Sequence, residues 1–212
     1  MKKLSTSKQM AINMVAAIVS FLIGTGINFV LAPYLVKELG SETYGFIGLA
    51  NNFVQYATIV TSALNSMSGR FISIEYSKGN IDKASRYFSS VLVAELIIAG
   101  VLLLVSSIIT FNIEFILNVP ENLVDSVKIL FALTFATFII SVITAIFTTA
   151  AFVKNKLYIN SLRDIASNTL KLLLVVILFS FFPAKVYFLA MASLASGIFL
   201  LLTNIKVKKK IL

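Results

Sequence analysis

The chain has no cysteine and no histidine, and only 13% of its 212 residues are charged. Without these two residue types it can form no disulfide, carry out no thiolate chemistry and supply none of the usual zinc or iron ligand sets. We therefore expect no metal, no cofactor and no enzymatic activity. A typical soluble domain has about a quarter charged residues, so the scarcity of charge also argues against a water-soluble fold.

Hydrophobic residues make up 58% of the sequence and lie in long runs that are almost free of charge. A helix needs about 20 apolar residues to cross the hydrocarbon core of a bilayer. The runs do not alternate polar and apolar positions as the strands of a membrane barrel would. The sequence thus predicts an all-α polytopic membrane protein with a single domain of six transmembrane helices. Their approximate ranges are 10–36, 44–68, 87–112, 126–153, 157–182 and 186–205.

The basic residues are distributed so that every second connecting segment is positive. Segments 1–8, 70–86, 154–163 and 206–210 hold most of the 18 Lys and Arg residues, whereas Lys37, Lys128 and Lys185 are alone in the segments between them. Basic loops stay on the cytoplasmic side of a membrane. We expect both termini in the cytoplasm, and we assign the net charge of +9 to membrane topology rather than to nucleic-acid binding.

Several predicted helices carry polar side chains at helical spacing, which a helix surrounded only by lipid would not need. Such a face packs against another helix or lines a wet cavity. We favour packing for the Thr and Ser face of 134–148 and a cavity for the Asn and Gln face of the second helix. Arg70 closes that second face, either as a membrane anchor or as a contact for an anionic head group. The candidate cavity residues are Asn28, Asn51, Gln55, Ser62, Arg70, Asn168 and Lys171.

Three charged residues fall inside predicted membrane segments and are candidates for ion coupling or an intramembrane pair. Glu95 and Lys171 each lie about 12 to 13 Å along a helix from the basic residue at its start, too deep to reach the interface comfortably. Their helices run in the same direction. We expect the two to pair or to face one cavity, with either a structural or a functional role. Asp164, the third candidate, also fits a simple helix-start acid.

The first predicted hairpin reads PYLVKELGSETYG over residues 33–45. Gly40 is suited to end one helix in the left-handed region, Ser41 to cap the next, and Glu42 to lie in its positive first turn. The string resembles the P-x-L-x-R-x-L-G-x-x-x-Y-G signature of bacterial polysaccharide flippases, the polysaccharide transporter branch of the multidrug/oligosaccharidyl-lipid/polysaccharide exporter superfamily. Lys37 stands where the family commonly has Arg, so the charge is kept but the bidentate fork is lost.

This resemblance implies a fold and a function. Family members have two six-helix lobes around a central cavity, so the chain resembles the N-terminal lobe of a MATE-like flippase. The implied activity, used in O-antigen or capsule synthesis, flips undecaprenyl-pyrophosphate-linked oligosaccharide across the bacterial cytoplasmic membrane. Its partners would be this lipid-linked oligosaccharide, membrane lipids, and a second lobe or a homodimer partner, the chain being a fragment or a single-lobe relative. Alternatives are a drug or other lipid exporter of the same superfamily and a non-transporting membrane assembly subunit.

Overall fold

The computed structural model describes residues 6–153 and 155–211, with their side chains except at 6, 60, 63–65, 149–153 and 207–211. Within these residues the chain forms seven α-helices and one short 3-10 helix, with no strand. The predicted all-α fold is confirmed, and each predicted membrane segment corresponds to one long helix. The elements are α1 (Thr6–Leu39), α2 (Ser41–Ser77), α3 (Ile81–Phe111), α4 (Ile113–Ile116), η1 (Glu121–Leu123), α5 (Val124–Val153), α6 (Tyr158–Phe181) and α7 (Phe188–Ile211).

Five of the long helices in the described part of the chain are long and apolar enough to cross a membrane: α1, α3, α5, α6 and α7. The protein is therefore a multi-pass membrane protein. Helix α2 is not among the five, although it is the longest of all. Asn51, Asn52 and Gln55 lower its mean hydropathy. A sixth crossing by α2 stays a prediction.

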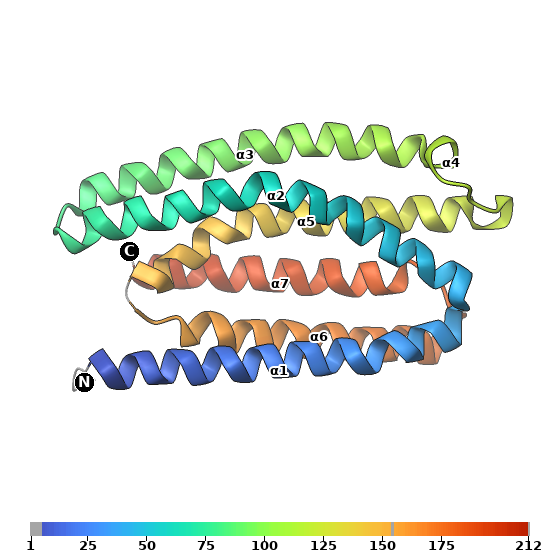
Figure 1. Cartoon of the computed structure of the whole chain (residues 1–212), viewed down its shortest axis with the longest axis horizontal. Coiled ribbons are helices and arrows are strands. Elements are labelled where there is room, and N and C mark those ends of the chain that lie inside the picture. The colour runs from blue at the N-terminus through green and yellow to red at the C-terminus, as the bar shows by residue number, and fades with distance from the viewer. Residues whose placement is uncertain (1–5, 154, 212) are drawn as a thin grey trace.

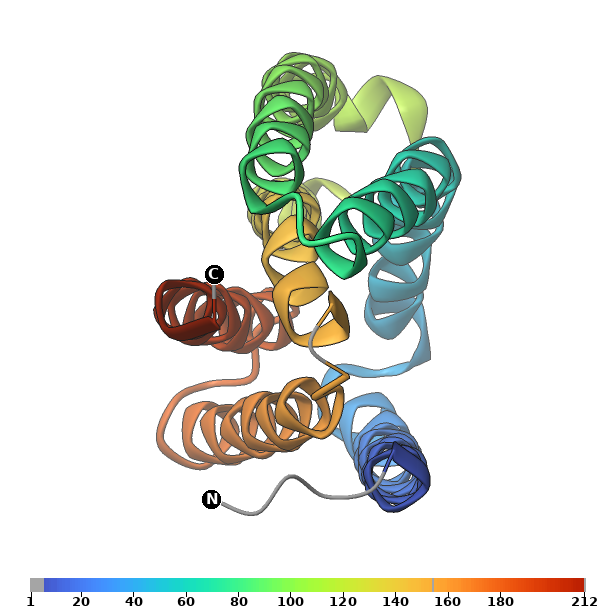
Figure 2. The same cartoon turned by 90° about the vertical axis from the view of Figure 1, so that its left-hand side faces the viewer.

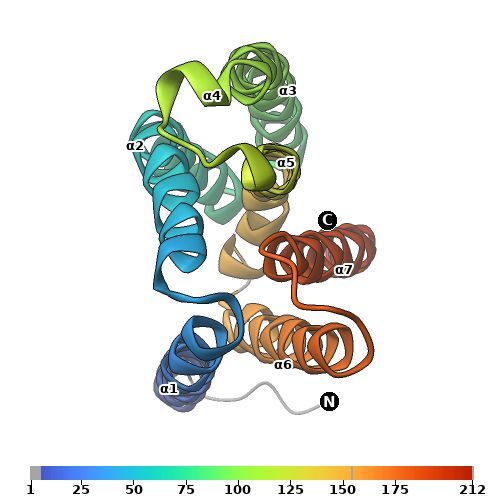
Figure 3. The same ribbon diagram turned by 90° about the vertical axis from the view of Figure 1, so that its right-hand side faces the viewer.

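The helices form an elongated bundle built around α5 (Figures 1 and 2). Helix α5 packs against α2 and α3 on one side and against α7 on the other, while α6 packs between α7 and α1. Figure 3 shows α1 and α6 side by side at the edge farthest from α3. The first turn of α1 and the last turn of α7 lie at the same end of the bundle, as an even number of crossings requires (Figure 1). We call this the terminal end; its cytoplasmic location is a prediction.

A one-residue break separates α1 from α2. Gly40 has a φ of +80°, the left-handed region that glycine enters without steric cost, as predicted. Its carbonyl accepts a hydrogen bond from the Tyr44 N–H at 3.0 Å, so Gly40 itself occupies the cap position. The prediction that Ser41 caps α2 is wrong. Ser41 is already the first helical residue, and the cap position is held by Gly40, which has no side chain to cap the helix. Glu42 lies in the first turn, as expected.

Three apolar clusters hold the bundle together. The largest joins α2, α5 and α7 with the short helix α4, whose Ile113 is fully buried. A second, around Leu35 and Val175, joins α1, α6 and α7. The third joins α2, α3 and α5 near the terminal end, where the rings of Phe88 and Phe147 meet edge to face at 5.7 Å. The first two clusters share the flanking residues Leu39, Tyr44 and Leu189, whereas the third is separate from them.

The connection between α2 and α3 is organised by one acidic side chain. Glu75 accepts hydrogen bonds from Lys78 Nζ at 3.3 Å and from Asn80 Nδ2 at 3.2 Å, and Lys83 Nζ lies 3.7 Å from its Oε2. Its side chain is only 10% exposed. The hydrogen bond from Asn80, aided by the two lysines, lowers the pKa of Glu75 below its ordinary value.

This lowered pKa predicts a pH-dependent contribution to stability. A carboxyl whose folded pKa lies below its unfolded value, about 4.3, stabilises the fold above that value and loses the effect as pH falls through the folded pKa. We expect Glu75→Gln to lower the thermal unfolding temperature in detergent by a few degrees at pH 7. The two proteins should converge below about pH 4. Exposed Glu38 provides the control, since Glu38→Gln should change little at either pH; an equal loss at both pH values for Glu75→Gln would contradict the prediction.

Candidate functional site

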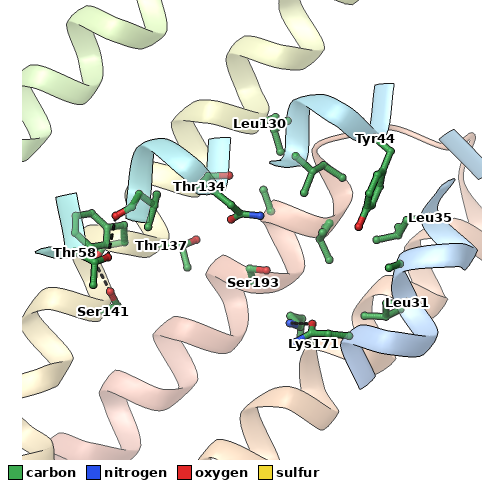
Figure 4. Close-up of a pocket in the computed structure, with 18 residues that line it drawn as sticks. Leu31, Leu35, Tyr44, Thr58, Leu130, Thr134, Thr137, Ser141, Lys171 and Ser193 are labelled. Carbon is green, nitrogen blue, oxygen red and sulfur yellow. Dashed lines mark hydrogen bonds between the residues drawn. The ribbon is translucent and has the colours of Figure 1, made fainter. Parts of the chain in front are cut away.

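A cavity of about 610 Å³ lies where α1, α2, α5, α6 and α7 converge (Figure 4). Apolar and polar side chains both line it, and Leu31 and Leu35 of α1 and Leu130 of α5 are among the apolar ones. The polar residues that line it are Asn28, Tyr44, Asn51, Thr58, Thr134, Thr137, Ser141, Lys171 and Ser193. The cavity is thus amphipathic, inside a bundle whose outer surface is largely hydrophobic.

Two hydroxyl groups of α5 that line the cavity donate their hydrogens to carbonyl groups of their own helix. Thr137 Oγ1 donates to the Leu133 carbonyl at 2.8 Å, and Ser141 Oγ donates to the Phe138 carbonyl at 2.7 Å. Their oxygens therefore present acceptor lone pairs to the cavity. The packing role favoured for this face is thus incomplete, because part of the same stripe forms a cavity wall.

Lys171 is the only charged residue among those that line the cavity. Its Nζ donates a hydrogen bond to Asn28 Oδ1 on α1 at 3.2 Å. An ammonium group has three N–H donors, and this bond uses one. Figure 4 shows the side chain lying across the gap between α6 and α1. The remaining donors make this end of the cavity suited to an anionic group.

Helix α6, which carries Lys171, is held in place by polar contacts near the terminal end. Asn13 of α1 accepts a hydrogen bond at its Oδ1 from the Tyr158 N–H, 3.1 Å away, and so caps the start of α6 from another helix. The Arg163 guanidinium donates to Asn204 Oδ1 on α7. These bonds set the rotation of α6 and with it the direction of the lysine.

The other predicted cavity residues lie beside the cavity or away from it. Gln55 and Ser62 line a shallower groove on α2 that Asn51 shares with the cavity. Asn168 and Asp164 line a groove between α1 and α6, described below. Arg70 is exposed and does not line the cavity, which agrees with a membrane anchor more than with a cavity residue.

The predicted pairing of Glu95 with Lys171 is corrected by the structure. Glu95 is 2% exposed, and within the part of the chain whose side chains are described neither of its carboxylate oxygens has a hydrogen-bond partner. Helix α3 packs on α2 and α5 and makes no contact with α6 (Figure 2). Glu95 is also absent from the cavity lining, so the two residues share no cavity there. Their similar depth stays a prediction, but α5 and α7 stand between them.

Several cavity residues were not among the predicted ones. Thr134, Thr137 and Ser141 were assigned to packing, and neither Tyr44, at the start of α2, nor Ser193 of α7 was a candidate. The available signal for Ser193 was the small-residue face that it forms with Ser196 and Gly197, which permits close helix packing.

Five helices long and apolar enough to span a membrane, in a bundle with an amphipathic cavity, define this protein as a polytopic membrane protein. A family model described as "Polysaccharide biosynthesis protein" matches residues 10–210. The chain belongs to this family of polysaccharide biosynthesis membrane proteins, as the hairpin motif indicated. It is 33% identical over 187 residues to "Uncharacterized membrane protein EpsK" of Bacillus subtilis (strain 168). No solved structure matches it.

The alignment with the Bacillus protein covers 88% of this chain but only 37% of the relative. The chain therefore spans little more than a third of that relative's length. An activity of the full-length relative can therefore be assigned to this chain only as a proposal.

Proposed function

We propose that this chain is the N-terminal lobe of a transporter that flips a pyrophosphate-linked lipid oligosaccharide across the bacterial cytoplasmic membrane for polysaccharide synthesis. The observation that carries the proposal is the amphipathic cavity with Lys171 at one end. Membership of a polysaccharide biosynthesis family supports the same class of substrate. In this assignment both termini face the cytoplasm.

The chemistry of such a substrate matches the cavity part by part. A pyrophosphate binds most strongly to a cationic group, and Lys171 provides one whose ammonium has N–H donors not used by Asn28. Sugar hydroxyls both donate and accept hydrogen bonds. The amide of Asn51 can donate to and accept from them, and the hydroxyl oxygens of Thr137 and Ser141 can accept from them. An isoprenoid tail needs no polar partner and can remain in lipid, next to the exposed apolar side chains of the bundle.

Transport requires a second half of the protein on the other side of the substrate site. Secondary transporters rock two halves of a bundle about a site that lies between them. This chain supplies one half, and it covers 37% of its Bacillus relative. We therefore assign the second half to a C-terminal lobe or to a second copy of the chain. Transport by the chain while crosslinking shows only monomers would contradict this assignment.

Thiol labelling tests the cavity directly, because the sequence has no cysteine of its own. Asn51→Cys and Gln55→Cys should react with a charged, water-soluble methanethiosulfonate in lipid vesicles, since a thiolate forms and reacts only where water enters. A short isoprenyl pyrophosphate bearing one sugar should slow the reaction at Asn51→Cys several-fold, whereas the corresponding isoprenyl alcohol should not.

The matched control is Ile97→Cys on α3, a position 64% exposed on the apolar outside of the bundle. It should resist the charged reagent and accept a lipid-soluble maleimide. Labelling of Asn51→Cys that no pyrophosphate probe slows would argue for a cavity with another ligand. Failure of both Asn51→Cys, in the cavity, and Gln55→Cys, in the adjoining α2 groove, to label would favour a non-transporting assembly subunit.

A further inference from the structure

A second concave site runs along the outside of the cavity, between α1 and α6. It has a volume of about 510 Å³ and extends from the terminal end of α6 toward Lys171. The side chains that line it are mostly small and polar, with one aromatic ring. They are Ala17, Ser20, Phe21, Gly24, Thr25 and Asn28 of α1, Ser161, Asp164, Ser167 and Asn168 of α6, and Leu200 of α7. We call this site the α1–α6 groove.

The groove and the cavity meet at one residue pair. Asn28 lines both of them, and its Oδ1 accepts the hydrogen bond from Lys171 Nζ. Lys171 lines the cavity, and Asn168, three residues earlier on α6, lines the groove. A ligand whose anionic group lies at Lys171 can therefore extend into either space.

The groove differs from the cavity in charge. No Lys or Arg lines it, and its single charged residue is the carboxyl group of Asp164. Asp164 precedes Lys171 by seven residues, about 10 Å along the helix, so the acid lies within the groove and the base lies just beyond the groove's Asn168 end. A phosphate is attracted to the lysine end and repelled from the Asp164 end.

The remaining groups suit a carbohydrate ring. A sugar offers hydroxyls that donate and accept hydrogen bonds around a ring with an apolar C–H face. Asp164 accepts, Asn168 both donates and accepts, and the Thr25 hydroxyl does both. Phe21, which is 69% exposed, supplies an aromatic face on which an apolar ring face can lie.

Gly24 keeps the central part of the groove open. A Cβ at this position would lie 3.3 Å from Asn168 Nδ2, closer than side chains usually pack. With glycine there, α1 approaches α6 without covering the amide, which stays available to a ligand. A larger side chain at 24 should displace the amide or occupy the groove.

We propose that the α1–α6 groove is a carbohydrate subsite, which holds the sugar next to the phosphate of a lipid-linked substrate while Lys171 holds the phosphate itself. This inference rests on the proposed function and assigns the sugar-binding residues within it. The groove residues Asp164 and Asn168 then determine which first sugar is accepted.

Binding of two matched probes to the full chain in lipid nanodiscs tests the subsite. The probes are a ten-carbon isoprenyl pyrophosphate and the same compound bearing one N-acetylhexosamine. The wild type should bind the glycosylated probe about tenfold more tightly, the effect expected of one or two added hydrogen bonds. Asn168→Ala should abolish this preference and leave the affinity for the bare pyrophosphate unchanged. Asp164→Asn should also abolish the preference but raise the affinity for the bare pyrophosphate, because it removes a negative charge that repels the phosphate.

Two further variants keep the test decisive. Gly24→Val should remove the same preference by filling the groove, without deleting a hydrogen-bonding group. Thr169→Ala, at an exposed neighbouring position on α6 outside the groove lining, should behave as the wild type. Equal affinity of the wild type for both probes would overturn the subsite and leave the proposed function standing. Binding of neither probe would overturn both.

Discussion

Replacing Glu95 by methionine is expected to stabilise the protein, although Glu95 is among its most deeply buried residues. The side chain is 2% exposed on α3, and neither carboxylate oxygen has a hydrogen-bond partner among the described side chains. A buried polar group without a partner costs about 1 to 3 kcal/mol, and a side chain of similar length without polar atoms removes that cost. We expect Glu95→Met to raise the free energy of unfolding by that amount, measured by thermal or denaturant unfolding in detergent.

No charge on the neighbouring helices compensates Glu95. The contact between Phe71 and Tyr87 places Arg70 of α2 at least two helical turns from the level of Glu95. On α5, Lys128 forms an ion pair with Glu114, with 2.6 Å between Nζ and Oε2. Asp125 lies one helical turn before Lys128 on the same helix. Among the described side chains, Glu95 therefore has no partner with which it could form a structural ion pair.

Glu114 provides the matched control for the Glu95 substitution. Because Glu114 pairs with Lys128, Glu114→Met should lower stability, opposite in sign to Glu95→Met. A loss of stability in both variants would contradict the prediction and point to a partner for Glu95. If Glu95→Met is more stable but inactive in transport, the acid is kept for ion coupling, a role that the sequence predicts and that stays a proposal.

Replacing Lys171 is expected to have the largest effect on function. Lys171→Met keeps the length of the side chain but removes the one cation that lines the cavity, together with its bond to Asn28. A hydrogen bond to a charged group contributes about 1.5 to 3 kcal/mol, so affinity for an isoprenyl pyrophosphate should fall by roughly 10- to 150-fold. Lys171→Glu should abolish binding, because it sets a carboxylate against Asn28 Oδ1 and the phosphate.

Binding in nanodiscs and flipping of a fluorescent isoprenyl pyrophosphate in proteoliposomes both report this effect. Lys171→Arg should retain most of the binding, because it retains the charge. Lys37→Met, which removes an exposed cation in the last turn of α1 that does not line the cavity, is the control and should bind as the wild type. Unchanged affinity in Lys171→Met would remove the central assumption of the proposed function.

The comparison of Glu95 with Lys171 shows where reasoning from the sequence ends. Their depths follow from counting residues along a helix, which is a local property. Their separation follows from the order in which the helices pack, and α3 lies on the far side of α5 from α6. No pattern within either segment carries that information. Asn28 and Lys171, 143 residues apart, were both candidates, but only packing showed that they bond to each other.

The Ser and Thr stripe of α5 makes the same point at the level of a single helix. Its spacing correctly indicated a face turned away from lipid. Whether such a face packs or lines a cavity depends on the neighbour opposite each residue, and the answer differs along the stripe. Thr137 and Ser141 line the cavity, whereas Thr144, one turn later, is buried.

The sequence by itself determined the class of the protein, the positions of its long helices, the glycine turn at Gly40 and the family. These follow from hydropathy, from left-handed backbone geometry and from a contiguous motif, all of which act over short stretches of chain. Only the tertiary structure decided which polar faces meet, that Glu95 is isolated, and that a groove joins the cavity at Asn28. Those features depend on the rotation and order of the helices, which are set by side-chain packing between segments far apart in the chain.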